Sequence, residues 1–203
     1  MKQINPQYWL GLIFILLAVT VVGCLPETDD VQDVEGTEVL MSRHDNRAGE
    51  ITDLAAQNRL LAEVHKATAK YQRVEMALAD GYVPASPCVA APGKGGMGVH
   101  YVNFPLVDGE HDPLRPEALV YEPMKNGRMN LVAVEYIMVA DLLKDKYKAP
   151  LFGQITMDNH LDGAPLGFPH YQLHVWIWKN NPSGIYTPYN PRVSCEYGES
   201  YPH

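Results

Sequence analysis

Apolar side chains recur at helical spacing between residues 51 and 80, where the hydrophobic pattern of the chain is clearest. Arginine, lysine and glutamate side chains occupy the opposite face of the same stretch. The apolar stripe consists of Leu54, Leu61, Val64, Tyr71, Val74 and Leu78. Gly81 follows as a helix stop. No second stretch of this kind is found, so we expect the helix to pack against a β-sheet.

Later segments alternate with a period of two, which is typical of strands. The first is GVHYVNF, residues 98–104, and the last is YQLHVWIW, residues 171–178. Between them, Asn126 and Gly127 predict a two-residue type I′ turn in a hairpin over residues 118–140. That turn pairs Glu122 with Leu131 and Ala118 with Glu135. Both acids then lie on one face of the hairpin.

The predicted fold is α+β, with one long amphipathic helix packed on a mostly antiparallel sheet. The chain has 16 glycines and 16 prolines in 203 residues, which indicates many loops and turns. Residues 151–169 show no sustained period and are expected to form a long loop that carries His160. One compact domain, residues 49–203, accounts for these elements.

An apolar run over residues 10–23 ends at Cys24 and follows Lys2. The run has the length of a signal-peptide core and is short for a membrane span. The letters VVGC resemble the bacterial lipobox, in which the cysteine is lipidated and becomes the new N-terminus. We therefore expect a signal peptide over residues 1–23 and a lipid on Cys24; an uncleaved anchor helix is the alternative. Both place the domain in the bacterial cell envelope, outside the cytoplasm and attached to a membrane.

Residues 25–48 are rich in acids and lack a sustained apolar period, so residues 24–48 are predicted to be a flexible acidic linker. The whole chain has a net charge of −8. Removing residues 1–23 takes away one lysine and no acid, which leaves 15 basic and 24 acidic residues, or −9. A surface of this charge repels phosphate backbones, so nucleic acid is not expected as a partner.

Cys88 and Cys195 remain once Cys24 is assigned to lipid, and an exported compartment permits a disulfide between them. Closing a loop of about 100 residues stabilises a domain by about 4–5 kcal/mol in the chain-entropy model. Two free thiols or a thiolate metal site are the alternatives.

His170 and His174 form an HxxxH pair, which binds one metal ion when it lies on a helix. Pro169 and the VWIW run favour a strand, in which the two Cα atoms are about 13 Å apart. One metal ion with ligands at about 2 Å cannot join them. The pair instead lies on one strand face together with Gln172, Trp176 and Trp178.

A different histidine pair is compatible with strands. If GVHYVNF and YQLHVWIW are neighbours in the sheet, His100 and His174 converge. The third ligand is then expected from His170, His160, Glu122 or Glu135, and zinc, copper or iron suits such a set. A metal-free polar pocket and purely structural histidines are the two alternatives.

No Ser-His-Asp order, HExxH helix, CxxC pair or dinucleotide-binding loop is found, so no reaction is assigned by motif. The leading hypothesis is binding of a metal ion or small ligand in a histidine-lined pocket. The second is a metal-dependent envelope enzyme with Glu135 or Glu122 as general base. The third is a structural or interaction module without a small-molecule site.

Several separated strings, GMGVHYVN, DPLRPEALVYEP, LVAVEY, PHYQLHVWIWKNNPSG and NPRVSC, lie between about residues 65 and 195. Together they resemble an uncharacterised family of exported bacterial proteins and lipoproteins. The resemblance implies export and a shared compact domain. It implies no activity and transfers no catalytic residue.

Overall fold

The computed structural model describes the backbone of residues 35–198 and the side chains from residue 49 onward. The predicted signal peptide and Cys24 lie outside the described residues. Contacts divide the chain into two units, Met1–Arg43 and His44–His203. No helix in the described part of the chain is long and apolar enough to cross a membrane. The sheet, the disulfide and the candidate site all belong to the second unit.

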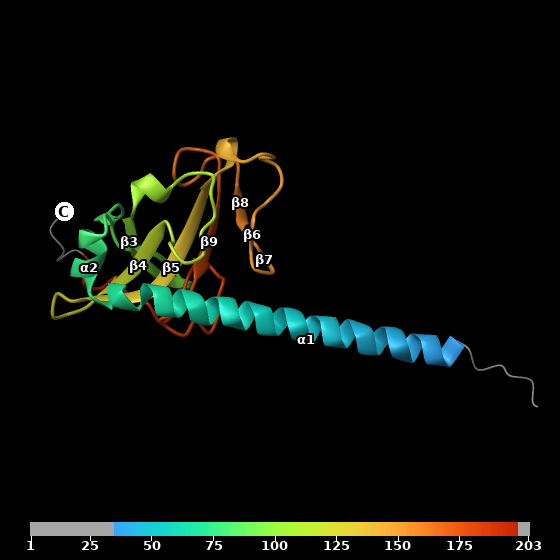
Figure 1. The fold of residues 1–203 in the computed structure, drawn as a ribbon. Helices are drawn as coiled ribbons and strands as arrows, with labels where there is room; N and C mark the ends of the chain where they lie inside the picture. The colour runs from blue at the N-terminus through green and yellow to red at the C-terminus, as the bar shows by residue number, and fades with distance from the viewer. Residues whose placement is uncertain (1–34, 199–203) are drawn as a thin grey trace, which may run out of the picture. The chain divides into compact units, whose positions relative to one another are not determined.

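The fold is α+β, as predicted, with a mostly antiparallel sheet (Figure 1). The helical elements are α1 Glu35–Thr68, η1 Ala69–Gln72, α2 Val74–Ala79, η2 Phe104–Leu106 and η3 Ala140–Leu142. The strands are β1 Val83–Pro84, β2 Val89–Ala91, β3 Gly95–Val102, β4 Ala118–Pro123, β5 Met129–Val139, β6 Leu151–Phe152, β7 Ile155–Thr156, β8 Asp158–His160 and β9 His170–Val175. The main sheet has the order β1-β3-β4-β5-β9-β8, with β2 also paired to β3; β6 and β7 form a second, two-stranded sheet.

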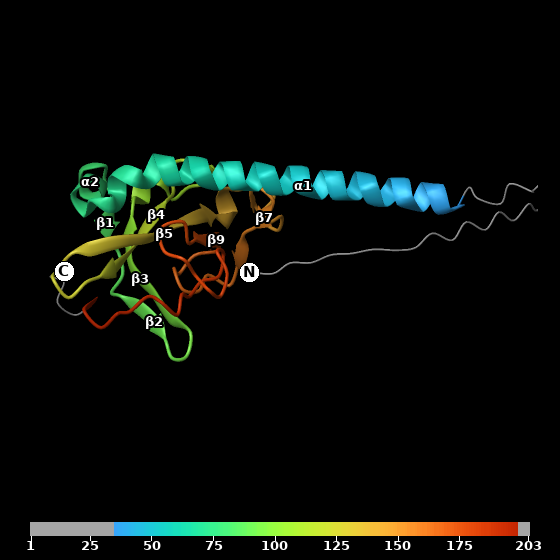
Figure 2. The same cartoon turned by 90° about the horizontal axis from the view of Figure 1, so that it is seen from below.

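One face of the main sheet carries the largest core, and the C-terminal part of α1 covers it (Figures 1 and 2). Val64 of α1 and Tyr71 of η1 are buried against sheet residues such as Tyr121, Tyr136 and Leu173. The opposite face carries two smaller clusters, which include Val120, Val132 and Trp176 in one and Val102, Ala118 and Ile137 in the other. The sheet is therefore buried on both faces, and its two faces differ in chemistry.

The predicted helix over residues 51–80 differs from the observed elements at both ends. Helix α1 begins at Glu35, within the segment predicted as a flexible linker. Thr68 ends α1, and α2 starts only after Arg73, which is extended. Tertiary hydrogen bonds hold this break: Trp178 donates to the Thr68 hydroxyl (3.1 Å), and the Tyr121 hydroxyl donates to the Tyr71 carbonyl (2.6 Å).

The hairpin between β4 and β5 does not have the predicted register throughout. Gly127 has a φ of +76°, and Met124 and Arg128 close a three-residue loop instead of a type I′ turn. Glu122 therefore pairs with Asn130 rather than with Leu131. A bulge between Val120 and Tyr121 shifts the register back by one residue, so that Ala118 pairs with Glu135 as predicted.

The glycine-rich run before His100 enters strand β3 at Gly95. Gly95 has a φ of +94°, and a Cβ atom there would lie 2.2 Å from the Asn190 carbonyl oxygen. A Cβ atom on Gly98 would lie 2.5 Å from the Tyr121 carbonyl oxygen. Close approach of β3 to two other segments therefore requires glycine at these positions.

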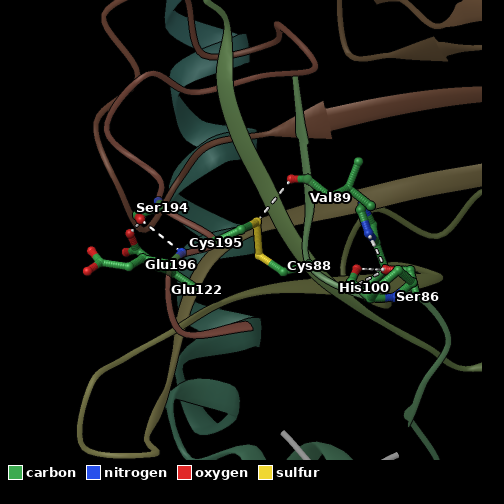
Figure 3. Close-up of a disulfide and its surroundings, with 9 residues drawn as sticks. Ser86, Cys88, Val89, His100, Glu122, Ser194, Cys195 and Glu196 are labelled. Carbon is green, nitrogen blue, oxygen red and sulfur yellow. Dashed lines mark hydrogen bonds between the residues drawn. A yellow bond between two sulfur atoms is a disulfide. The ribbon is translucent and has the colours of Figure 1, made fainter. Parts of the chain in front are cut away.

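The predicted disulfide is present: Cys88 and Cys195 are bonded, with their Cα atoms 5.5 Å apart (Figure 3). It joins the segment between β1 and β2 to the C-terminal tail. Ser86, two residues before Cys88, lies beside His100 in the same view. The disulfide therefore anchors a segment that contacts the candidate site.

Candidate metal centre

His100, Glu135 and His174 converge on the sheet face opposite α1 and form one candidate metal-binding group. Glu135 of β5 and His174 of β9 are direct cross-strand partners. His100 belongs to β3, so the expectation that the two histidine strands are neighbours is wrong: β4 and β5 separate them. The side chains nonetheless meet over β4, whose Val120 pairs with His100 and whose Ala118 pairs with Glu135.

The distances among the three side chains fit one metal ion better than a set of hydrogen bonds. The two Nε2 atoms are 3.3 Å apart, and the Glu135 oxygens lie 3.5 Å from His100 Nε2 and 3.6 Å from His174 Nε2. The nitrogen-to-oxygen distances are too long for good hydrogen bonds. Ligands at about 2.05 Å from a tetrahedral metal ion lie about 3.3–3.4 Å from one another. The two imidazole nitrogens and the nearest Glu135 oxygens thus lie at about the separation of ligands around one small divalent ion.

Ser86 fixes which nitrogen of His100 is available. The Ser86 hydroxyl donates to the Pro87 carbonyl (2.8 Å) and accepts from the His100 backbone N–H (3.1 Å). Its oxygen also lies 3.0 Å from His100 Nδ1 (Figure 3). Because the only hydroxyl hydrogen is directed at Pro87, Nδ1–H must donate to Ser86. The Nε2 lone pair of His100 then faces Glu135 and His174, as in a metal-binding histidine.

His174 is held by packing. The residue is 1% exposed, and its ring stacks with that of Trp176 at a centroid distance of 6.4 Å. Its Nδ1 atom is buried and has no hydrogen-bond partner among the described residues. The two histidines therefore differ: a hydrogen bond orients His100, and surrounding side chains orient His174.

Burial sets the charge of the metal-free cluster. Loss of solvent lowers the pKa of His100 to about 4 and that of His174 to about 3, the nearby His100 adding to the latter shift. Burial also raises the pKa of Glu135 to about 8, with a smaller contribution from Glu117. Near neutral pH the cluster is two neutral imidazoles and a protonated carboxyl group. A bound cation would replace that proton.

A cavity of about 360 Å³ opens beside the cluster. His100, Glu135 and His174 contribute to its wall, together with three neutral polar residues, Ser86, Gln172 and Tyr189. The other lining side chains are apolar: Ala85, Val89, Met97, Val102, Ile137, Pro165 and Leu166. The cluster thus has one side facing a mostly apolar space.

His160 and His170 lie together but outside the candidate group. Their rings stack at a centroid distance of 5.0 Å and an angle of 9°. His170 Nδ1 lies 2.8 Å from the Phe168 carbonyl oxygen, and its Nε2 lies 3.2 Å from Gln172 Oε1. The expected loop that carries His160 includes β6, β7 and β8, and β8 pairs His160 with His170. Both histidines are used in local contacts.

Glu122 is also placed apart from the group. Its carboxylate accepts hydrogen bonds from Lys179 Nζ (2.5 Å) and from the Ser194 backbone N–H (3.0 Å). These contacts tie the hairpin end to the C-terminal tail. Trp178, predicted on the same face as His174, points instead toward α1 and stacks on His65 at 3.8 Å, because β9 ends at Val175. His65 is exposed, and its ring covers that indole ring.

Ser86, Met97 and Tyr189 are site residues that the sequence reasoning missed. Ser86 lies in a proline-rich loop, and Tyr189 lies in an irregular tail. Neither segment has a hydrophobic period that would orient its side chains. Their proximity to Cys88 and Cys195 in the sequence is the one available signal.

No family model matches the chain, and no curated protein or solved structure matches it at a significant level.

Proposed function

We propose that the domain binds one divalent transition-metal ion through His100, His174 and Glu135. The observation that carries the proposal is the convergence of three buried side chains: the two Nε2 atoms are 3.3 Å apart, Glu135 Oε2 is 3.5 Å from His100 Nε2, and Glu135 Oε1 is 3.6 Å from His174 Nε2. Two imidazoles and one carboxylate suit zinc, iron(II) or copper(II). The cavity beside the cluster supports a role in which the bound ion meets a small ligand.

A metal-dependent enzyme is the second candidate function. Three protein ligands leave at least one coordination position open, which is the arrangement of catalytic zinc and iron sites. The open side faces the cavity, and this position supports catalysis over storage. Glu135 is better used as a ligand than as a general base, and Glu122 is paired with Lys179. Activation of water by the metal itself is then the expected chemistry.

Elemental analysis of the full-length protein, purified without an affinity tag from the bacterial envelope, tests metal binding. We expect about one metal ion per chain in the wild type. His100→Ala, His174→Ala and Glu135→Gln should lose it while keeping the circular dichroism spectrum. His160→Ala is the matched control, because His160 is also a histidine of the sheet but lies outside the group.

Two outcomes would count against the proposal. A protein that remains free of metal after refolding with zinc, iron(II) or copper(II) would leave the structural or interaction module as the better reading. Equal metal loss in His160→Ala and His100→Ala would mean that the ion binds elsewhere. If the alanine variants unfold, His100→Gln and His174→Gln give the same test with a neutral side chain of similar polarity.

We also propose that the domain is a lipoprotein of the bacterial cell envelope, attached to a membrane through Cys24. The lipobox-like VVGC and the preceding apolar run support this proposal. Metabolic labelling with an alkyne fatty acid should mark the wild type and not Cys24→Ala. Labelling of both proteins, or of neither, would contradict it.

A further inference from the structure

We infer that the metal-loaded site takes an apolar molecule that carries one monoanionic oxygen donor, of which a monocarboxylic acid is the simplest class. This inference rests on the metal site proposed above and specifies its ligand. It has two parts, the charge that the open coordination position requires and the surface that the rest of the ligand meets.

The charge follows from the donor set. A divalent ion bound by neutral His100, neutral His174 and anionic Glu135 has a net charge of +1. Glu135 is 4% exposed and His174 is 1% exposed, so this charge is removed from bulk water. An uncompensated buried charge is unfavourable. One monoanion on the open position makes the centre neutral.

The cavity lining argues against other charges on the ligand. Among the described residues that line it, none is lysine or arginine, and Glu135 is the only acid. A phosphate dianion would leave an excess negative charge with no cation to pair with it. An ammonium group would meet the net positive metal centre and no acid beyond the one that binds the metal. A single negative charge is the balanced choice.

The remaining surface favours an apolar body. Val89, Met97, Val102, Ile137 and Leu166 belong to the lining, and Ile137 is 3% exposed. The volume of about 360 Å³ lies at the lower end of small-molecule sites. Ser86, Gln172 and Tyr189 supply neutral hydrogen-bonding groups that orient a ligand without changing the charge. An aliphatic chain or an aromatic ring fits this surface, and the charged end fits the metal.

The test uses full-length protein loaded with cobalt(II), whose visible absorption reports the coordination sphere. Cobalt stoichiometry is measured first, and then octanoate, benzoate, acetate, inorganic phosphate and octylamine are titrated separately. We expect octanoate or benzoate to change the cobalt spectrum saturably, with a Kd at least about tenfold below that of acetate, because two buried methylene groups already supply about that factor. Phosphate and octylamine should leave the spectrum unchanged. Octanoate and benzoate distinguish an aliphatic from an aromatic ligand.

Leu166→Glu is the informative variant, because Leu166 lines the cavity and is 43% exposed, so the substitution spares the core. It should keep cobalt at wild-type stoichiometry and weaken binding of the preferred carboxylate at least about tenfold, since it removes apolar contact and adds a like charge. Leu151→Glu is the matched control: Leu151 is 54% exposed and is not among the lining residues.

The outcomes separate the two proposals. Normal cobalt binding with equal affinity for acetate and octanoate, or with a spectral response to phosphate, would overturn the ligand class and leave the metal site intact. Equal effects of Leu166→Glu and Leu151→Glu would do the same. Failure to bind cobalt, zinc, iron(II) or copper(II) would remove both proposals.

Discussion

Ser86 and His100 are joined twice: the Ser86 hydroxyl oxygen accepts from the His100 backbone N–H at 3.1 Å and lies 3.0 Å from His100 Nδ1. The first contact fixes the position of the strand, and the second fixes the ring. A residue outside the main sheet therefore determines how a sheet residue presents its free nitrogen. This relationship makes the geometry of the proposed metal site dependent on a loop.

Ser86→Ala should weaken metal binding by about 10- to 100-fold, because His100 Nδ1–H loses the acceptor that sets its tautomer. Competition with a chromophoric chelator measures the change. Ser183→Ala is the control, since Ser183 is exposed and lies outside the cavity lining. Unchanged affinity in Ser86→Ala would show that packing alone orients the ring.

Reduction of the disulfide, or the double substitution Cys88→Ser and Cys195→Ser, should lower both stability and metal affinity. We expect a loss of about 2–5 kcal/mol in the free energy of unfolding, measured with urea. Metal affinity should fall because Ser86 loses its covalent anchor two residues away. A variant that is less stable but binds metal with unchanged affinity would show that the disulfide stabilises the fold without supporting the proposed site.

Burial raises the pKa of Glu117 to about 8 from the usual 4.5, and the Ile137 backbone N–H donates to its carboxyl group at 3.0 Å. Between these two pKa values the folded state holds a proton that the unfolded state has lost. The contribution of Glu117 to the free energy of unfolding is therefore at its maximum below pH 4.5. It falls as the pH rises toward 8, by up to about 1.4 kcal/mol per pH unit.

In chelator-treated protein, the window from pH 6.5 to 8 separates the effect of the buried carboxyl groups from that of the two histidines. Below pH 6.5, buried neutral His100 and His174 give a slope of the opposite sign. Glu135 contributes in the same direction as Glu117. Glu117→Gln should therefore remove about half of the decline in the free energy of unfolding over this window. Urea titrations at several pH values measure it, and an unchanged slope would contradict a buried neutral Glu117.

Lys179→Met should destabilise the fold by about 1–3 kcal/mol, because it leaves the Glu122 carboxylate buried without its cation. Metal content should not change. Adding Glu122→Gln should recover part of the loss, since the amide oxygen still accepts from the Ser194 backbone N–H. Loss of metal from the Lys179→Met variant would assign Glu122 a role at the site.

Patterns of apolar residues predicted the helix, the antiparallel sheet and the strand faces of His100 and His174. Cysteine pairing was predicted correctly. These features follow from the spacing of apolar residues within one segment or from the number of cysteines in the chain. The strand order does not, because two intervening strands are compatible with the same alternation. The sequence left the third member of the histidine group open among four residues, and the structure places Glu135 beside His100 and His174.

Other features depend on contacts between distant segments. The break after Thr68 needs Trp178 as a hydrogen-bond donor, and the two residues are 110 positions apart. The bulge beside Val120 compensates for a loop that is longer than the predicted turn by one residue. The need for glycine at positions 95 and 98 becomes visible only when the segments that approach them are known. Sequence periodicity carries no information about such approaches.

The bond between Cys88 and Cys195 encloses His100, Glu135 and His174 in one covalent ring. Cys195 comes after all three ligands in the chain, so during biosynthesis the ring closes only once every ligand has been made. For the proposed site, an ion that arrives before the disulfide forms meets His100 before its partner Ser86 is anchored. We therefore expect oxidation to precede stable loading of the proposed metal site, so that pulse-labelled chains acquire chelator-resistant metal only after the disulfide has formed.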